Sequence, residues 1–265
     1  MNSEEALALP DDRYWAGGHG RYNTYILTAL LATVPAFERF LCRTMETYLE
    51  SDKVTESGRR FANQLRVEEV EHIEEHDRVF NALTALGYPV EDIAKDTQAW
   101  LDEALASPLD TRMAYVALGE YNISNACRGI LRGHPMYEGG HRPWLDYQLQ
   151  HAEEEVSHYS LSLAICQQLK IPKWTFFRAY VKYSRKGTWA FISAIKHIHR
   201  NEGCPLSDRV KFWLYWYRTQ YFAKNPVFLE VTAKSILIFK EVYKNPEMQN
   251  WAEQHVESAK GKYGL

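Results

Sequence analysis

The chain has 265 residues, of which 46% are hydrophobic and 25% are charged, and its formal net charge is −3. These are the proportions of an ordinary globular protein, and a chain of this length buries a large core without disulfides. A protein that binds polyanions needs a clear excess of Lys and Arg. We therefore expect no nucleic acid partner.

The sequence carries no recognisable targeting or membrane segment. Its N-terminal residues are acidic and lack the apolar run of a signal peptide. The longest apolar-leaning stretch, residues 25–37, is too short to span a bilayer. The four cysteines show neither C-x-x-C pairing nor the spacing of a zinc site. We expect a cytoplasmic protein with no transmembrane segment.

Hydrophobic residues recur with the period of α-helices through nearly the whole chain, and strand-like alternation is almost absent. The expected helices cover residues 22–50, 53–86, 90–106, 108–131, 144–169, 174–200, 207–222, 226–243 and 246–260. An interruption of the first helix at Pro35 is left open. Gly87 suits the residue after a helix C-terminus, and Ser107-Pro108 is typical of a helix start. The expected fold class is all-α.

Three parts are expected along the chain: an N-terminal extension over 1–20, a metal-binding bundle over 21–172, and further helices over 173–265. The last part packs on the bundle, in the same domain or as an appendage. Residues 174–265 hold 19 of the 36 aromatic residues. Aromatic packing in a core or at a homodimer interface is the leading interpretation. The alternatives are a wall for an apolar substrate and a helix at a membrane surface.

Two of the expected helices carry a Glu-x-x-His motif with an additional histidine. The two sets are Glu69, His72 and His76 in one helix, and His151, Glu155 and His158 in the other. Within each set the spacing is three or four residues, so the side chains share one helix face. A single such motif suggests only pairing of surface charges, but its repetition on a second helix favours a metal site.

Two more expected helices each supply one carboxylate within an apolar stripe, at Glu38 and at Glu120. A lone buried carboxylate is costly unless it is paired or bound to a cation. In chain order the four helices supply Glu, Glu-x-x-His, Glu and Glu-x-x-His. This is the ligand pattern of two iron or manganese ions in a carboxylate-bridged four-helix bundle.

The expected metal ligands are Glu38, Glu69, His72, Glu120, His151, Glu155 and His158. Four carboxylates balance two divalent ions, and the imidazoles serve as neutral donors. His76 is left open as a ligand or a hydrogen-bond partner of one. The neighbouring acids are expected to be solvated: Glu68, Glu71, Glu74, Glu75, Glu153 and Glu154. His134 and His141 flank a glycine-rich loop, where exposure to solvent is the favoured expectation and a place at a substrate entrance is the alternative. His19, His197, His199 and His255 are expected to have no role.

At these residues the sequence resembles the bacterial ferritin-like proteins described as predicted metal-dependent hydrolases. The matching segments are residues 35–40, 69–76 and 150–158 together with Glu120, and the resemblance covers about residues 20–200. It implies a ferritin-like four-helix bundle. The additional aromatic-rich C-terminal helices are expected from the sequence alone and depart from the pattern of that family. The segment from His151 to His158 is also similar to di-iron arylamine N-oxygenases, which implies O2 chemistry.

The expected function is that of a non-haem di-iron oxygenase or oxidase. It uses O2 and two iron ions, with manganese the less favoured metal, to oxidise a small organic substrate that is apolar or aromatic in part. An external electron donor and a homodimer are compatible with this function. The alternatives are a metal-dependent hydrolase, in which a bridging hydroxide attacks the substrate, and a non-catalytic metal-binding ferritin-like protein.

Overall fold

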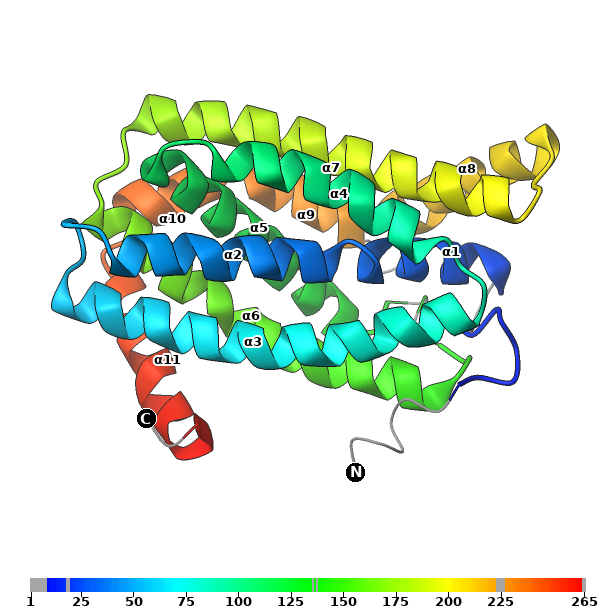
Figure 1. The fold of residues 1–265 in the computed structure, drawn as a ribbon, viewed down its shortest axis with the longest axis horizontal. Coiled ribbons are helices and arrows are strands. Elements are labelled where there is room, and N and C mark those ends of the chain that lie inside the picture. The colour runs from blue at the N-terminus through cyan, green and yellow to red at the C-terminus, as the bar shows by residue number, and fades with distance from the viewer. Residues whose placement is uncertain (1–8, 18–19, 135, 137, 223–226, 264–265) are drawn as a thin grey trace.

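The computed structural model describes residues 9–17, 20–134, 136, 138–222 and 227–263, and over these residues the chain forms helices and loops without a strand. The predicted all-α fold class is confirmed. Figure 1 shows long helices lying side by side along the longest axis of the molecule. The helices are α1 (Arg21–Leu31), α2 (Val34–Leu49), α3 (Glu56–Ala85), α4 (Val90–Leu105), α5 (Leu109–Leu131), α6 (Arg142–Gln168), α7 (Lys173–Asn201), α8 (Leu206–Tyr221), α9 (Val227–Ser235), α10 (Ile238–Lys244) and α11 (Met248–Tyr263).

Four of these helices form the central bundle. Helix α2 packs on α3, α3 on α6, α6 on α5, and α5 on α2, so the four helices enclose a common interior. The remaining helices cover this bundle: α4 packs on α2, α7 and α9 pack on α5, and α11 packs on α3 and α6. The four central helices are those in which the sequence places the metal-binding motifs.

Two of the expected long helices are each divided in two. The first breaks between α1 and α2 at Ala32 and Thr33, which confirms the interruption near Pro35. Pro35 lies in the first turn of α2, where its missing N–H leaves no helical hydrogen bond unmade. The helix expected over 226–243 is divided into α9 and α10. Gly87 follows α3 with a φ of 82°, as its expected position after the helix requires.

The stretch Arg21–Leu49 is long and apolar enough to cross a membrane by length and composition alone. It comprises α1 and α2, and 78% of its most apolar window is buried inside the protein. The core helices of globular proteins pass the same test. No other helix among the described residues meets this criterion.

The aromatic residues of the C-terminal part divide between a buried and an exposed face of α8. Phe212 is buried against Tyr22 and Tyr25 of α1, with ring centroids 5.9 and 6.3 Å away. Leu214 and Tyr217 on the other face are exposed. Aromatic packing therefore fastens α8 to the start of the bundle, as the leading interpretation of this segment expects, and leaves part of its apolar surface free.

Gly119 allows α5 to approach α2 next to the site. A Cβ built on Gly119 falls 1.9 Å from the nearest ring carbon of Phe37, so the ring would have to move. We expect Gly119→Ala to lower the free energy of unfolding by about 1–3 kcal/mol, the usual range for overpacking, as measured by urea denaturation. Gly187→Ala on α7, where nothing lies within 4 Å of the new Cβ, is the matched control and is expected to be neutral or stabilising. Equal stability of the two variants would contradict this account of the packing.

Candidate metal centre

The interior of the four-helix bundle contains a dense cluster of carboxylates and imidazoles. The residues that are at most 2% exposed are Glu38 of α2, Glu69, His72 and His76 of α3, Glu120 of α5, and Glu155 and His158 of α6. His151 of α6 joins them and is partly buried. The structure thus brings together every residue that the sequence suggested as a metal ligand.

One group of donors lies between α2, α3 and α6. Donor atoms of Glu38, His72, His151 and Glu155 all lie within 4.8 Å of one another. His76, which the sequence left open, reaches the same place: its Nε2 lies 3.2 Å from Oε1 of Glu38 and 3.3 Å from Nε2 of His151. Three imidazoles and two carboxylates therefore converge on this position.

A second group lies deeper, between α3, α5 and α6. Donor atoms of Glu69, His72, Glu155 and His158 again lie within 4.8 Å of one another. Nδ1 of His158 is 3.0 Å from Oε1 of Glu69 and 4.0 Å from Oε2 of Glu120. The second group is therefore richer in carboxylates than the first.

Glu155 belongs to both groups and faces each with a different oxygen. Its Oε1 lies 3.4 Å from Nε2 of His151, in the first group. Its Oε2 lies 3.3 Å from Nδ1 of His158, in the second group. A carboxylate with this placement is suited to bridge two cations.

Each Glu-x-x-His histidine also contacts an outer carboxylate from the opposite motif. Nε2 of His72 lies 3.2 Å from Oε2 of Glu154, and Nε2 of His158 lies 3.3 Å from Oε2 of Glu68. The expectation that Glu68 is solvated is therefore wrong, whereas the side chain of Glu154 is 30% exposed and so remains partly solvated. Glu68 is only 4% exposed, because α11 packs over this face of α3.

The outer contact of His158 continues to the C-terminal helix. Nε2 of His255 on α11 lies 2.9 Å from Oε1 of Glu68, so the expectation that His255 has no role at the site is also wrong. The sequence contained a usable signal for the outer carboxylates, since both motifs read Glu-Glu-x-x-His. It contained none for His255, because only the tertiary fold brings α11 to α3.

The other histidines lie apart from the donor cluster. His134 was expected to be exposed and is instead buried, with Nδ1 accepting a hydrogen bond from the backbone N–H of Met136 at 3.1 Å. His199 is also buried, against the ring of Phe212. His197 lies 3.0 Å from a carboxylate oxygen of Asp96. His141 is half-buried rather than exposed, and His19 lies outside the described residues.

The buried charges shift one another's protonation. Burial and the nearby Glu155 carboxylate raise the pKa of Glu69 to about 7. Burial, together with Glu69 and Glu155, also raises the pKa of Glu120. Burial lowers the pKa of His151 to about 3, and the neighbouring imidazoles act in the same direction. Although burial acts in the opposite direction, the neighbouring carboxylates raise the pKa of His72 to about 11 and also raise that of His158. Without cations, the cluster therefore retains protons on imidazoles as well as on Glu69 and Glu120.

Several buried polar atoms of the cluster lack a hydrogen bond. A bound metal ion would satisfy them, so they indicate whether these residues fit a metal. Within the described part of the chain, Oε2 of Glu38 and Oε2 of Glu120 are buried without a hydrogen-bond partner, and Oε1 of Glu38 and Oε2 of Glu155 each lie near one imidazole nitrogen, at 3.2 and 3.3 Å. Leaving such an atom unsatisfied costs about 1–3 kcal/mol. Carboxylate oxygens and imidazole nitrogens are the donors that bind iron, manganese and zinc. The residues present fit two divalent ions.

A comparison with protein families is consistent with a metal-binding protein. The family described as predicted metal-dependent hydrolase matches residues 6–249. The chain belongs to this family. No curated protein and no solved structure shows a significant match to it. The family match includes all four central helices and ends just before His255 on α11, so the outermost contact of the cluster lies beyond it.

The outer carboxylates are expected to strengthen metal binding by orienting the two imidazoles. Glu68→Gln and Glu154→Gln should each weaken Zn²⁺ or Co²⁺ binding about 10- to 100-fold, as removal of such partners does in other metalloproteins. The measurement is a competition titration against a chromophoric chelator. Glu71→Gln and Glu153→Gln, which alter exposed acids on the same two helices, are the matched controls. Unchanged affinity in both outer-carboxylate variants would rule out the orienting role.

Proposed function

We propose that this member of the family is a metal-dependent enzyme with two divalent ions held between α2, α3, α5 and α6. The observation that carries the proposal is the position of Glu155, whose two oxygens face different histidines in two overlapping donor groups that also share His72. Glu38, Glu69, Glu120 and Glu155 would supply four negative charges to two divalent ions. When bound, the ions would act as Lewis acids toward water or substrate.

Hydrolysis is the reaction that we propose first, because the description of the family names it and because it requires no redox partner. The residues of the chain have three tasks in such a reaction. The carboxylates hold the ions, His151 remains a neutral donor because burial keeps its pKa low, and the surrounding helices exclude bulk water. Exclusion of water strengthens the electrostatic interactions inside the site.

Oxidation of an organic substrate with O2 is the second candidate, and one observation favours it. The four helices supply Glu, Glu-x-x-His, Glu and Glu-x-x-His to a common interior, which is the donor set of di-iron and di-manganese carboxylate proteins. This candidate requires iron as the resident metal and an electron donor. The two candidates therefore differ in the metal and in the requirement for O2.

We place the substrate in an apolar cavity of about 410 Å³ beside the donor cluster. The cavity lies between α1, α5, α7 and α9, and its size is within the range of small-molecule sites. Ile123, which lines it, follows Glu120 by one helical turn. Tyr183 also lines it, and burial together with the Glu120 carboxylate raises the pKa of this tyrosine. The cavity therefore adjoins the donor cluster on the side of Glu120.

Two polar atoms on the cavity wall favour a substrate that is apolar but carries one polar group. Oδ1 of Asn122 is buried without a hydrogen-bond partner in the described part of the chain. Because Nδ1 of His134 accepts a hydrogen bond, its Nε2 carries the proton, which can be shared between the backbone of Thr219 and a substrate oxygen. An ester or amide of a medium-sized acid matches these features.

The test compares metals and substrates on the same preparation. Metal-free protein is loaded with Zn²⁺, with Mn²⁺ or, under anaerobic conditions, with Fe²⁺. We expect the Zn²⁺ or Mn²⁺ form to cleave p-nitrophenyl hexanoate without O2, and we expect Glu155→Gln to abolish this activity. Ala126→Phe, which fills the cavity, should raise KM for the hexanoate more than for the acetate while leaving the metal content unchanged.

The outcomes separate the two candidates. Consumption of O2 after Fe²⁺ loading, with no hydrolysis by the Zn²⁺ and Mn²⁺ forms, would replace hydrolysis by oxidation. Hydrolysis that survives Glu155→Gln would show that the activity does not come from this site. Binding of two ions without either reaction would overturn the enzymatic proposal and leave a metal-binding protein.

A further inference from the structure

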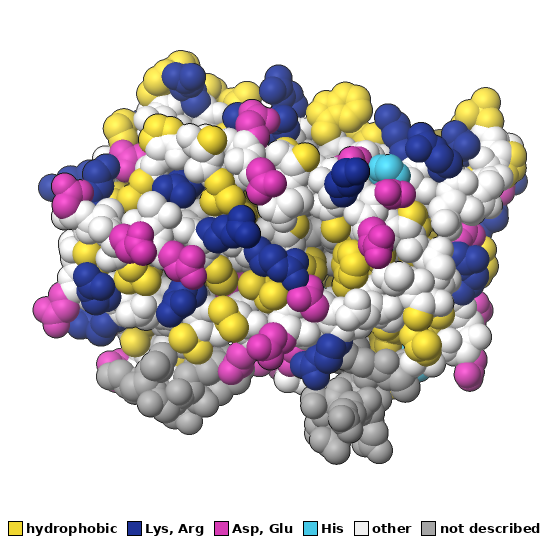
Figure 2. Space-filling model, viewed as in Figure 1, with side chains coloured by type: hydrophobic (Ala, Val, Ile, Leu, Met, Phe, Trp, Pro, Cys, Tyr) yellow, Lys and Arg dark blue, Asp and Glu magenta, His cyan; other side chains and the backbone are white. Residues whose placement is uncertain are grey.

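Helix α7 exposes a stripe of large apolar side chains to solvent. Trp174 is 66% exposed, Phe177 42%, Val181 50% and Trp189 58%. These residues follow one another at intervals of three, four and eight residues, so they lie along one side of the helix. In Figure 1, α7 forms the upper border of the molecule, and Figure 2 shows apolar side chains alternating with Lys and Arg along that border. An exposed apolar surface of this kind often marks a site of interaction with another protein or with a membrane.

The charge of α7 has a single sign. Its 29 residues include seven Lys and Arg and no Asp or Glu. Lys182 and Lys186 form ion pairs with Glu103 of α4, with N–O distances of 2.9 and 3.0 Å. Arg178 and Arg185 form no ion pair with any described residue, and both are exposed. These two cations are therefore available to an external partner.

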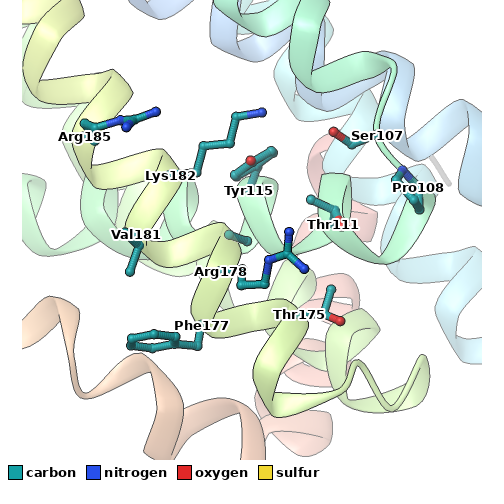
Figure 3. Close-up of a pocket in the computed structure, with 11 residues that line it drawn as sticks. Ser107, Pro108, Thr111, Tyr115, Thr175, Phe177, Arg178, Val181, Lys182 and Arg185 are labelled. Carbon is teal, nitrogen blue, oxygen red and sulfur yellow. The ribbon is translucent and has the colours of Figure 1, made fainter.

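The free cations lie on the same helix as the apolar stripe and next to it. Figure 3 shows Arg178 and Arg185 extending toward a hollow of about 620 Å³, with Phe177 and Val181 extending from the other side of the helix. Leu206 and Val210 of α8 line a hollow together with Lys196 of α7. Leu214 and Tyr217 are exposed farther along α8 at helical spacing. Arg209 and Arg218 add positive charge to that helix. The exposed faces of α7 and α8 together are called the basic apolar face below.

We propose that the basic apolar face docks on the surface of a lipid bilayer that contains anionic phospholipid. Helices at such interfaces combine Trp, Phe and Leu on their buried face with Lys and Arg near the headgroups. Tryptophan is enriched at the level of the headgroups, and each nearby cation adds attraction to an anionic leaflet. Both parts of this chemistry are present on α7, with Trp174 and Trp189 beside Arg178 and Arg185.

Charge disfavours a second copy of the chain as the occupant of this face. In a symmetric dimer the same surface of each copy meets the other. The cations of α7 would then approach the cations of its partner, and α7 offers no acid to compensate them. A nucleic acid would satisfy the cations but would leave aliphatic side chains such as Val181 and Leu206 without an apolar partner. An anionic bilayer provides negative headgroups for the cations and an apolar interior for the aliphatic and aromatic side chains.

The test measures partition of the protein onto vesicles by co-sedimentation. We use phosphatidylcholine vesicles with and without about one quarter phosphatidylserine, the anionic lipid of such surfaces. The protein is expected to bind the anionic vesicles and to lose binding as salt is added. The double variant Arg178→Glu with Arg185→Glu, and separately Trp174→Ser with Trp189→Ser, should each lower the partition coefficient at least about tenfold.

A matched charge reversal on another face provides the control. Arg59→Glu with Arg78→Glu changes two exposed arginines of α3 and should leave vesicle binding nearly unchanged. Circular dichroism and metal content establish that each variant is folded. Equal partition onto neutral and anionic vesicles, or an equal loss of binding in the α3 variant, would overturn the proposal. A third result would also overturn it. If the protein does not bind vesicles, forms a dimer in analytical ultracentrifugation, and becomes a monomer in the variant Trp174→Ser with Trp189→Ser, then the face is a homodimer interface.

Discussion

Replacement of Glu155 by alanine is expected to remove both metal ions, and not one, from the protein. Each of its oxygens faces a different donor group, so its loss takes a ligand and a negative charge from both positions. The three remaining carboxylates would also supply too little negative charge to offset the repulsion between two neighbouring divalent ions. Inductively coupled plasma mass spectrometry after loading and desalting should give two ions per chain for the unaltered protein and almost none for Glu155→Ala.

Glu153→Ala is the appropriate control for this experiment. Glu153 lies on the same helix two residues away but is exposed to solvent, so its loss should leave both ions bound. Retention of one ion by Glu155→Ala would show that the two positions are independent. Retention of both ions would contradict the role of Glu155 altogether.

Metal loading is expected to raise the melting temperature by roughly 10 °C, and a chelator should reverse the rise. A ligand at about 1,000 times its Kd stabilises the folded state by about 4 kcal/mol. For a chain of this size each kcal/mol raises Tm by about 2–4 °C. The structure adds a reason for a large effect, because burial and the neighbouring carboxylates raise the pKa of Glu69 and Glu120, and bound cations would compensate these buried charges. Differential scanning calorimetry with and without chelator provides the measurement.

The Glu155→Ala variant distinguishes stabilisation by metal bound at the cluster from stabilisation by metal bound elsewhere on the protein. Glu155→Ala should melt at a temperature that Zn²⁺, Mn²⁺ or Fe²⁺ does not raise. A similar rise in this variant would place the stabilising ions elsewhere on the protein. No rise in the unaltered protein would show that the cluster does not bind metal tightly.

Helical spacing was sufficient to find the inner members of the cluster. Glu69 and His72, or Glu155 and His158, are three residues apart, and that interval places both side chains on the same face of any α-helix. Glu38 and Glu120 could be found because a carboxylate within an apolar stripe demands a partner. These inferences depend on local geometry, which the sequence encodes directly.

Residue spacing within a helix could not predict contacts between segments that are far apart in the sequence. Spacing assigned Glu68 and Glu154 to the solvated side of their helices. Each nevertheless reaches the histidine of the opposite motif, and this depends on how α3 and α6 are placed against each other. His255 reaches Glu68 only because α11 returns to the bundle. The apolar cavity likewise arises from four helices that are separated along the chain.

The uneven distribution of histidines gives the two halves of the metal centre different characters. His76 and His151 both lie toward Glu38, whereas the position near Glu69 and Glu120 is dominated by carboxylates. Two bound ions would therefore not be interchangeable, and we expect them to bind in two distinguishable steps. A metal that prefers nitrogen donors would select the first position, and a harder ion would select the second. A protein prepared with two different metals could thus carry them in a defined order.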